Sequence, residues 1–180
     1  MTSPAKLIII SVLLLIEFTS HTVGISEVLF KSVQSRSTHR YISNHSVEIV
    51  NGTLYTEFQL IRRLDPGVRC HLEFQLRIAN SKRYQSLFFF DIDICGTIIA
   101  LKDHFLKSWY RSLMKYSNFM ENCPFNPDRY YLKGWKLDAS LFPKYLYPGD
   151  YNIIVIIYNG PYRKRGMDLV TEVQLETNVI

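Results

Sequence analysis

The chain has 180 residues, of which 47% are hydrophobic and 14% aromatic, and its 21 Lys and Arg outnumber its 16 Asp and Glu. This composition excludes a disordered chain, because low hydrophobicity and high net charge are what prevent a chain from burying a core. With 8 Gly and 7 Pro, the chain is neither collagen-like nor of low complexity. The length favours one folded domain.

The first residues predict a secretory signal peptide. Lys6 precedes an apolar run over residues 7–16, and small residues follow, with cleavage expected after Gly24. A membrane anchor is the alternative, but spanning a bilayer takes about 20 apolar residues, and Glu17 ends this run too early. We therefore expect residues 1–24 to be removed and residues 25–180 to form a single, secreted domain without a transmembrane anchor.

The surface chemistry agrees with secretion. Two sequons, at Asn44 and Asn51, predict N-glycosylation of an extracellular protein. The net charge of +5 indicates, in a secreted protein, solubility or attraction to anionic lipid and glycan surfaces. Since no basic helix and no alternation of basic and aromatic residues is present, we expect no nucleic-acid partner.

Most of the chain alternates between apolar and polar residues with the period of two that is typical of half-buried β-strands. The alternation is strict over residues 68–78, whereas residues 151–158 are apolar on both faces, which predicts a central strand. Several short strands separated by turns favour an all-β fold, an antiparallel β-sandwich. The other expected strands are residues 54–60, 88–95, 130–137 and 169–176.

Two connections carry further predictions. Pro66 and Gly67 are typical of a turn, so we expect the strands 54–60 and 68–78 on either side to form a hairpin. Between residues 97 and 116, apolar residues recur at spacings of three and four, which predicts one helix with an apolar stripe. Such a stripe usually packs into a core, and the sharper interpretation is a lid over the gap between the sheets.

Three cysteines, Cys70, Cys95 and Cys123, allow three pairings with one thiol left over. Cys70 lies in the apolar series of residues 68–78, which indicates a buried thiol. Cys95 lies in the polar series at the end of its expected strand, and Cys123 lies in a loop-like Asn-Cys-Pro segment. We therefore expect a Cys95–Cys123 disulfide and a free Cys70. The alternative is that Cys70 bridges to a second chain.

No motif predicts catalysis. The chain has no nucleophile elbow, no His-Glu-x-x-His and no Gly-rich phosphate loop. Asp91 and Asp93 share one strand face, but a pair does not supply the six to eight oxygens of a calcium site, and we interpret the two as a solvated face. The histidines show no ligand spacing. We therefore expect neither an enzyme nor a cofactor nor a metal.

Three motifs, in order and spacing, resemble a known family: Asp93-Ile94-Cys95, residues 117–125 with their Cys-Pro step, and Pro148-Gly149-Asp150-Tyr151. Over about residues 40–175 the chain resembles a large insect family of small secreted proteins with a domain of unknown function. That family is similar to the lipid-recognition (ML) superfamily, which includes the ganglioside activator, sterol carriers, innate-immune lipid co-receptors and insect chemosensory proteins linked to contact pheromone detection.

The resemblance implies an immunoglobulin-like sandwich, with one helical insert between two cysteines, whose sheets splay around an apolar ligand. It also implies that Cys95 and Cys123 form the family's disulfide. The chain departs from the family by placing Cys70 on an inward strand, where an aliphatic residue is usual.

These expectations combine into a predicted ligand pocket, which is typically concave and mostly apolar. The expected partner is a hydrophobic small molecule or lipid, with a membrane receptor as a second partner in chemosensation or pheromone recognition. A basic loop, Arg163, Lys164 and Arg165, is expected at the mouth to contact an anionic headgroup. The alternative is a solid immunoglobulin-like module that binds a protein partner, because a packed core shows the same periodicity. The expected pocket-lining residues are Phe58, Cys70, Leu72, Phe74, Phe88, Phe90, Ile92, Phe105 and Trp109.

Overall fold

The structure is a computed structural model that describes residues 27–78, 81–100, 107–119, 121–141 and 146–180, without the side chains of Ile99, Ala100 and Trp109. The expected signal peptide, residues 1–24, and Phe105 lie outside the described residues. Within the described ranges, the helices are all too short or too polar to cross a lipid bilayer.

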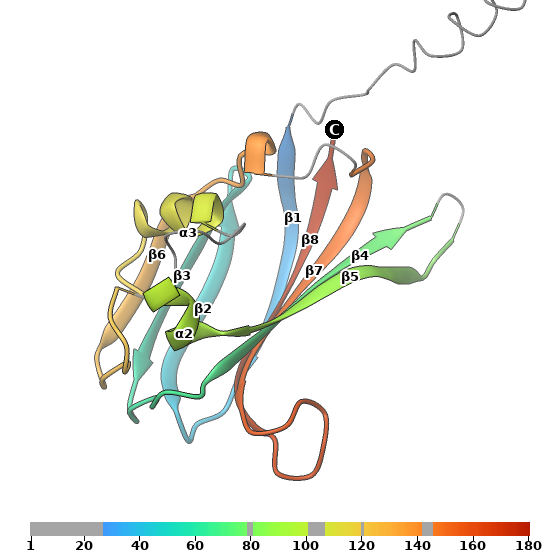
Figure 1. Ribbon diagram of the computed structural model, residues 1–180. Helices are drawn as coiled ribbons and strands as arrows, with labels where there is room; N and C mark the ends of the chain where they lie inside the picture. Colours follow the sequence, from blue (N-terminus) through green and yellow to red (C-terminus); the bar gives the residue numbers. More distant parts are fainter. Residues whose placement is uncertain (1–26, 79–80, 101–106, 120, 142–145) are drawn as a thin grey trace, which may run out of the picture.

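The chain forms an antiparallel β-sandwich of two sheets (Figure 1). The helical elements are α2 (Ile94–Ala100), α3 (Lys107–Met114) and the 3₁₀ helix η1 (Ala139–Leu141). The strands are β1 (Val28–Ser37), β2 (Ile42–Val50), β3 (Thr53–Leu60), β4 (Arg69–Arg77), β5 (Tyr84–Asp93), β6 (Arg129–Trp135), β7 (Gly149–Asn159) and β8 (Asp168–Val179). The larger sheet has the order β1-β8-β7-β4-β5, and the smaller sheet has the order β2-β3-β6.

The strand that is apolar on both faces is central, as its sequence predicts. β7 lies between β4 and β8, and each of its two neighbours pairs with it in antiparallel register. Strands covered on both faces carry apolar residues throughout, because neither face meets water. The all-β prediction and the six expected strand regions are confirmed, within a few residues at each end.

The expected hairpin across Pro66 and Gly67 is wrong. β3 and β4 lie in different sheets, so residues 61–68 are a crossover between the sheets rather than a hairpin turn. The hairpin partner of β3 is β2, and the two are joined by Asn51 and Gly52, both with positive φ (51° and 70°). A two-residue Asn-Gly loop matches the twist of the flanking strands and is the strongest short hairpin signal.

The helical insert differs in detail from the expected single helix. α2 and α3 are two helical segments, and the residues between them, 101–106, lie outside the described part of the chain. β5 ends at Asp93, whose Oδ1 accepts a hydrogen bond from the Gly96 N–H at 3.0 Å. This side chain thereby satisfies one of the free N–H groups at the start of α2. Cys95 consequently lies in the first turn of α2 and not at the end of a strand.

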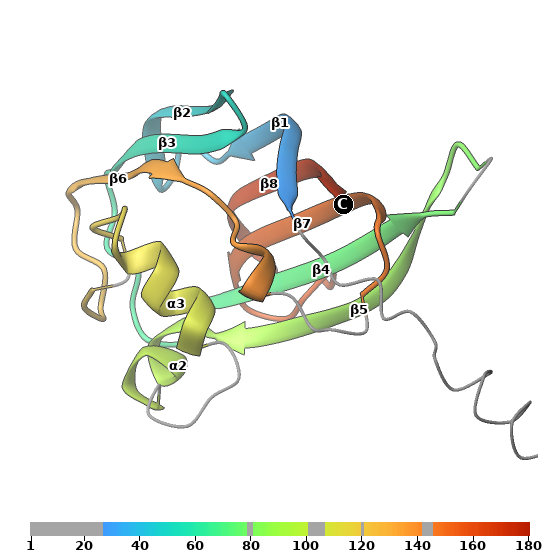
Figure 2. The ribbon, with the colours of Figure 1, turned by 90° about the horizontal axis from the view of Figure 1, so that it is seen from above.

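The two long sides of the sandwich close differently. On one side the chain passes directly from β1 in the larger sheet to β2 in the smaller sheet. On the other side the edge strands β5 and β6 are apart, and α2 and α3 lie between them (Figure 2). The predicted Cys95–Cys123 disulfide is confirmed, with a Cα–Cα distance of 5.5 Å, and it ties α2 to the segment that leads into β6.

Candidate ligand cavity

A cavity of about 290 Å³ lies between the two sheets. All of its described lining residues are uncharged, and most are aliphatic or aromatic. The larger sheet contributes Phe30, Cys70, Leu72, Ile92, Ile153, Val155, Ile157, Val173 and Leu175. The smaller sheet contributes Val47, Leu54, Thr56, Leu132 and Trp135, and the remaining lining residues are Ile94, Thr97, Tyr110, Leu113, Phe119 and Leu137.

Every second residue of a strand points to the same face of its sheet, so alternate residues of each strand point between the sheets. Along β7, Ile153, Val155 and Ile157 line the cavity. The intervening Ile154 and Ile156 are buried on the opposite face of the sheet, in a separate cluster with the loop that follows β7. A one-residue shift in strand register would exchange the two sets.

Aromatic side chains close one end of the cavity. Phe119, in the segment after α3, lines the cavity and stacks on Phe125 at 5.1 Å between ring centroids. Its ring also meets Phe58 edge-on at 5.5 Å. On the smaller sheet, the Trp135 Nε1–H donates a hydrogen bond to Ser112 Oγ at 3.1 Å, which links β6 to α3. Because the N–H group is bonded to Ser112, the part of the Trp135 side chain that lines the cavity is the apolar ring.

Cys70 is the free cysteine, and its thiol belongs to the cavity wall. Burial, with a smaller contribution from the negative charge of Asp91, raises the pKa of this thiol to about 12. The thiol is therefore protonated at neutral pH and is a poor nucleophile, because the thiolate is the reactive form. It adds one weak hydrogen-bond donor to the cavity and no charge.

Three of the expected pocket residues, Cys70, Leu72 and Ile92, line this cavity. Phe58 does not, because Phe119 covers it. The side chains of Phe105 and Trp109 lie outside the described part of the chain.

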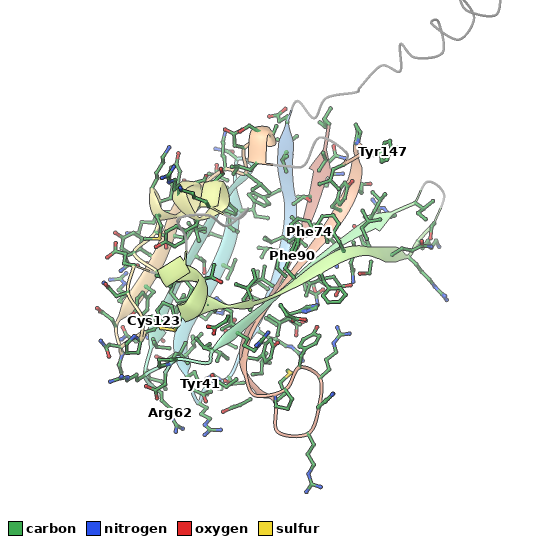
Figure 3. The ribbon with its side chains drawn as sticks, in the orientation of Figure 1. Tyr41, Arg62, Phe74, Phe90, Cys123 and Tyr147 are labelled. Atoms are coloured by element: carbon green, nitrogen blue, oxygen red, sulfur yellow. A yellow bond between two sulfur atoms is a disulfide. The ribbon has the colours of Figure 1, made fainter. Side chains whose placement is uncertain are left out.

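Three other expected lining residues, Phe74, Phe88 and Phe90, are not part of the cavity wall either. Phe74 stacks on Phe88 at 4.8 Å, and Phe88 meets Phe90 edge-on at 5.6 Å. Figure 3 shows Phe74 and Phe90 on the neighbouring strands β4 and β5. The three rings pack against one another and fill this part of the sandwich, so the cavity does not extend here.

Several lining residues of the cavity lie outside the predicted set. Phe30 and Val47 lie on β1 and β2, which the sequence pattern does not predict as strands, and Trp135 lies at the end of β6. Tyr110 and Leu113 come from α3, where burial raises the pKa of the Tyr110 hydroxyl. The three-residue spacing of Tyr110 and Leu113, which places both on one helix face, was a signal that could have found them.

The basic residues Arg163, Lys164 and Arg165 do not lie at the mouth of the cavity, so that expectation is wrong. Their loop packs on the outer face of the larger sheet, where the Tyr162 ring stacks on the His71 ring at 4.1 Å. The buried apolar side chains of this loop determine its position, and they direct it away from the space between the sheets.

The outer face also has a hollow of about 390 Å³, lined by Gln34, Ser35, Arg36, Glu172 and Gln174. It is polar, and its two charged residues, Arg36 and Glu172, form an ion pair. Among the residues that the structure describes, no group of three or more His, Cys, Asp or Glu side chains is arranged to hold a metal ion. The sequon residues Asn44 and Asn51 are both exposed, and their glycosylation stays a prediction.

The architecture places the protein in the class of antiparallel β-sandwiches with an uncharged internal cavity. Residues 70–153 match the model of a family described as a protein of unknown function (DUF1091). The match extends from β4 into β7, and it includes both cysteines of the disulfide and the helical segments between the sheets. No curated protein matches the chain.

Proposed function

We propose that this protein is a secreted binding protein that holds a hydrophobic small molecule or a lipid chain between its two β-sheets. The observation that supports this function best is the uncharged cavity of about 290 Å³, because ligand pockets are typically concave and mostly apolar. Binding is noncovalent, and each CH₂ group that leaves water contributes about 0.8 kcal/mol.

Secretion is part of the proposal. Disulfides persist in oxidising compartments, and the Cys95–Cys123 bond joins two segments of the sandwich. The apolar run near the N-terminus and the exposed Asn44 and Asn51 agree with an extracellular protein.

The physiological setting follows from the resemblance to the insect family and the ML superfamily. A sandwich with an apolar interior supports that relationship, since those proteins hold apolar ligands between splayed sheets. We therefore propose a role in chemosensation or in lipid or pheromone recognition, with a membrane receptor as the partner that reads the loaded state.

The rival function is a solid interaction module that binds a protein through its outer surface. Such a module needs an interior packed to the density of an organic crystal, with few voids larger than a water molecule. The volume between the sheets supports the carrier instead.

The direct test is native mass spectrometry of the mature chain secreted from eukaryotic cells, followed by organic extraction. We expect a hydrophobic molecule to travel with the protein at close to one per chain. A bare mass, together with a panel of neutral and charged lipids of which none adds its mass to the chain, would exclude the carrier.

A further inference from the structure

Within the part of the chain that the structure describes, the inside of the sandwich offers no charged partner for an ionised group. The described cavity wall has no charged side chain. Two of its polar groups are already engaged, because Thr56 Oγ1 donates to the Ser46 carbonyl oxygen at 3.1 Å and Trp135 Nε1 donates to Ser112 Oγ. An ionised carboxylate or ammonium that enters such a site loses its hydration without gaining a partner, which is strongly unfavourable.

Three basic groups on the outer face of the larger sheet have partners outside the cavity. The Arg163 guanidinium lies over the Tyr162 ring, 5.1 Å from its centroid, on the face of the sheet that points away from the cavity. Lys31 and Arg77 both contact the Asp150 carboxylate. These cations are therefore not arranged to attract an anionic ligand into the sandwich.

The volume limits how much of a ligand can enter. An apolar cavity of roughly 150 Å³ accommodates a benzene molecule. At about 290 Å³, the cavity has about twice that volume, so a chain of about 10–14 non-hydrogen atoms fills it. A sterol or a two-chain lipid does not fit whole.

We infer that the cavity binds one uncharged hydrocarbon chain of about 10–14 non-hydrogen atoms, in preference to ionised lipids of the same length. The inference rests on the proposed carrier function and makes it specific. It needs no headgroup contact, since the wall that surrounds the chain is apolar on both sheets.

The cavity contains its own reporter for a test. The chain has two tryptophans, and Trp135 lines the cavity, so a Trp109→Phe variant reports ligand entry through Trp135 fluorescence alone. Decan-1-ol and decanoate are matched in chain length and differ in charge. We expect the alcohol to bind at least tenfold more tightly than the carboxylate at pH 8.

Chain length tests the size limit in the same assay. From octan-1-ol to dodecan-1-ol the affinity should rise by about fourfold for each CH₂ group, which corresponds to about 0.8 kcal/mol. Beyond about 14 non-hydrogen atoms the gain should stop, because further carbons remain outside the cavity. A Trp109→Phe/Trp135→Phe variant, which has no tryptophan, is the matched control and should show no fluorescence change.

Native mass spectrometry of the unsubstituted chain is a second readout that does not depend on either tryptophan variant folding. Decan-1-ol should add its own mass once per chain, and a Leu72→Trp variant, whose larger ring occupies the cavity, should bind none. Equal affinity for decanol and decanoate, or a gain in affinity that continues to octadecanol, would overturn the inference and leave the carrier function intact. If no probe of either charge changes the Trp135 fluorescence or adds its mass to the chain, the carrier function is excluded as well.

Discussion

The two faces of the five-stranded sheet differ in how their apolar side chains are covered. β7 is apolar on both faces, but Ile154 and Ile156 are covered by Tyr162 and Met167 from the loop that follows the strand. On the inner face, Val155 and its neighbours border an open volume instead. The chain covers one apolar face of β7 with its own side chains and leaves a cavity against the other.

Charge separates the two faces as clearly as packing does. On the outer face the buried His71 contacts Asp91 at 2.9 Å and Glu73 at 3.5 Å, and Arg36 pairs with Glu172. The described inner wall carries no charged residue. These charged groups of the outer face thus pair with one another, whereas the inner face has few polar groups, which suits an apolar ligand.

The largest expected loss of stability comes from removing the Cys95–Cys123 disulfide, which links α2 to the segment before β6. In a Cys95→Ala/Cys123→Ala variant, loss of a disulfide with a sequence separation of 28 should lower the free energy of unfolding by roughly 3–4 kcal/mol on the chain-entropy model. Urea denaturation measures the change. A Cys70→Ala variant, which removes a thiol but no cross-link, should lose about 1 kcal/mol, and an equal loss in both would contradict this role of the disulfide.

Truncation on β7 compares the filled and the hollow face directly. Ile156→Ala should lower the free energy of unfolding by about 2–4 kcal/mol, because it opens a cavity in a packed cluster. Val155→Ala should lower it by about 1 kcal/mol, since it only enlarges a cavity that already exists. Both values come from denaturant unfolding, and equal costs would mean that the inner face is as tightly packed as the outer one.

Larger side chains at two paired residues, Leu72 on β4 and Phe90 on β5, should have different effects on stability. Phe90 packs against the core, so Phe90→Trp should lower the free energy of unfolding by about 1–3 kcal/mol. Leu72→Trp should leave stability within about 1 kcal/mol and abolish ligand binding, because the larger ring occupies the cavity. Thermal melting and the decanol titration separate these outcomes, and a destabilised Leu72→Trp that still binds ligand would refute the cavity's position.

A pair of tyrosines tests how completely the outer face satisfies its polar groups. The buried Tyr162 hydroxyl has no hydrogen-bond partner in the described part of the chain, so Tyr162→Phe should raise the free energy of unfolding by about 1 kcal/mol. The Tyr158 hydroxyl donates to Asp91 at 3.4 Å, so Tyr158→Phe should lower it by about 1 kcal/mol. Denaturation of both variants at pH 7 checks the signs, and a loss in Tyr162→Phe would reveal a partner for its hydroxyl.

The smallest expected effect is a pH dependence confined to the outer face. Hydrogen bonds from Lys31 and then Arg77 lower the pKa of Asp150 from 3.8 to about 2. A lowered pKa in the folded state adds stability that is complete above the unfolded pKa and is lost as the pH falls from about 4 towards 2. Because the carboxylate is partly exposed, Asp150→Asn should cost only about 1 kcal/mol at pH 7.

The same variant should cost nothing near pH 2, where the native carboxyl group becomes protonated. Urea midpoints between pH 2 and pH 7 measure the difference. A difference between Asp150→Asn and the native chain that is independent of pH would exclude the carboxylate charge as its origin. Binding of an uncharged ligand should not change over the range in which the protein stays folded.

How far local patterns predict the fold depends on how many apolar residues alternate within a strand. The unbroken alternation of residues 68–78 predicts β4 almost to its ends. β1 and β2 escaped prediction because residues 31–37 of β1 include one apolar residue, Val33, and residues 43–46 of β2 include none. A period of two cannot be recognised where apolar residues do not recur.

Two turn signals show what a local pattern leaves open. Asn51 and Gly52 belong to a sequon and also form the hairpin loop between β2 and β3. Pro66 and Gly67 do mark a turn, with the Val68 N–H donating to the Asp65 carbonyl oxygen. That turn lies inside a crossover between sheets, and a turn residue alone does not reveal which strands its neighbours pair with.

The sequence by itself determined the strand faces and the central position of β7, because these follow from residue type and short-range periodicity. The tertiary structure decided which apolar face is filled. Tyr162 and Met167 cover one face of β7, the rings of Phe74, Phe88 and Phe90 fill one part of the interior, and the remaining interior stays hollow. Periodicity records that a side chain leaves water, but the volume opposite it is set by segments distant in the chain.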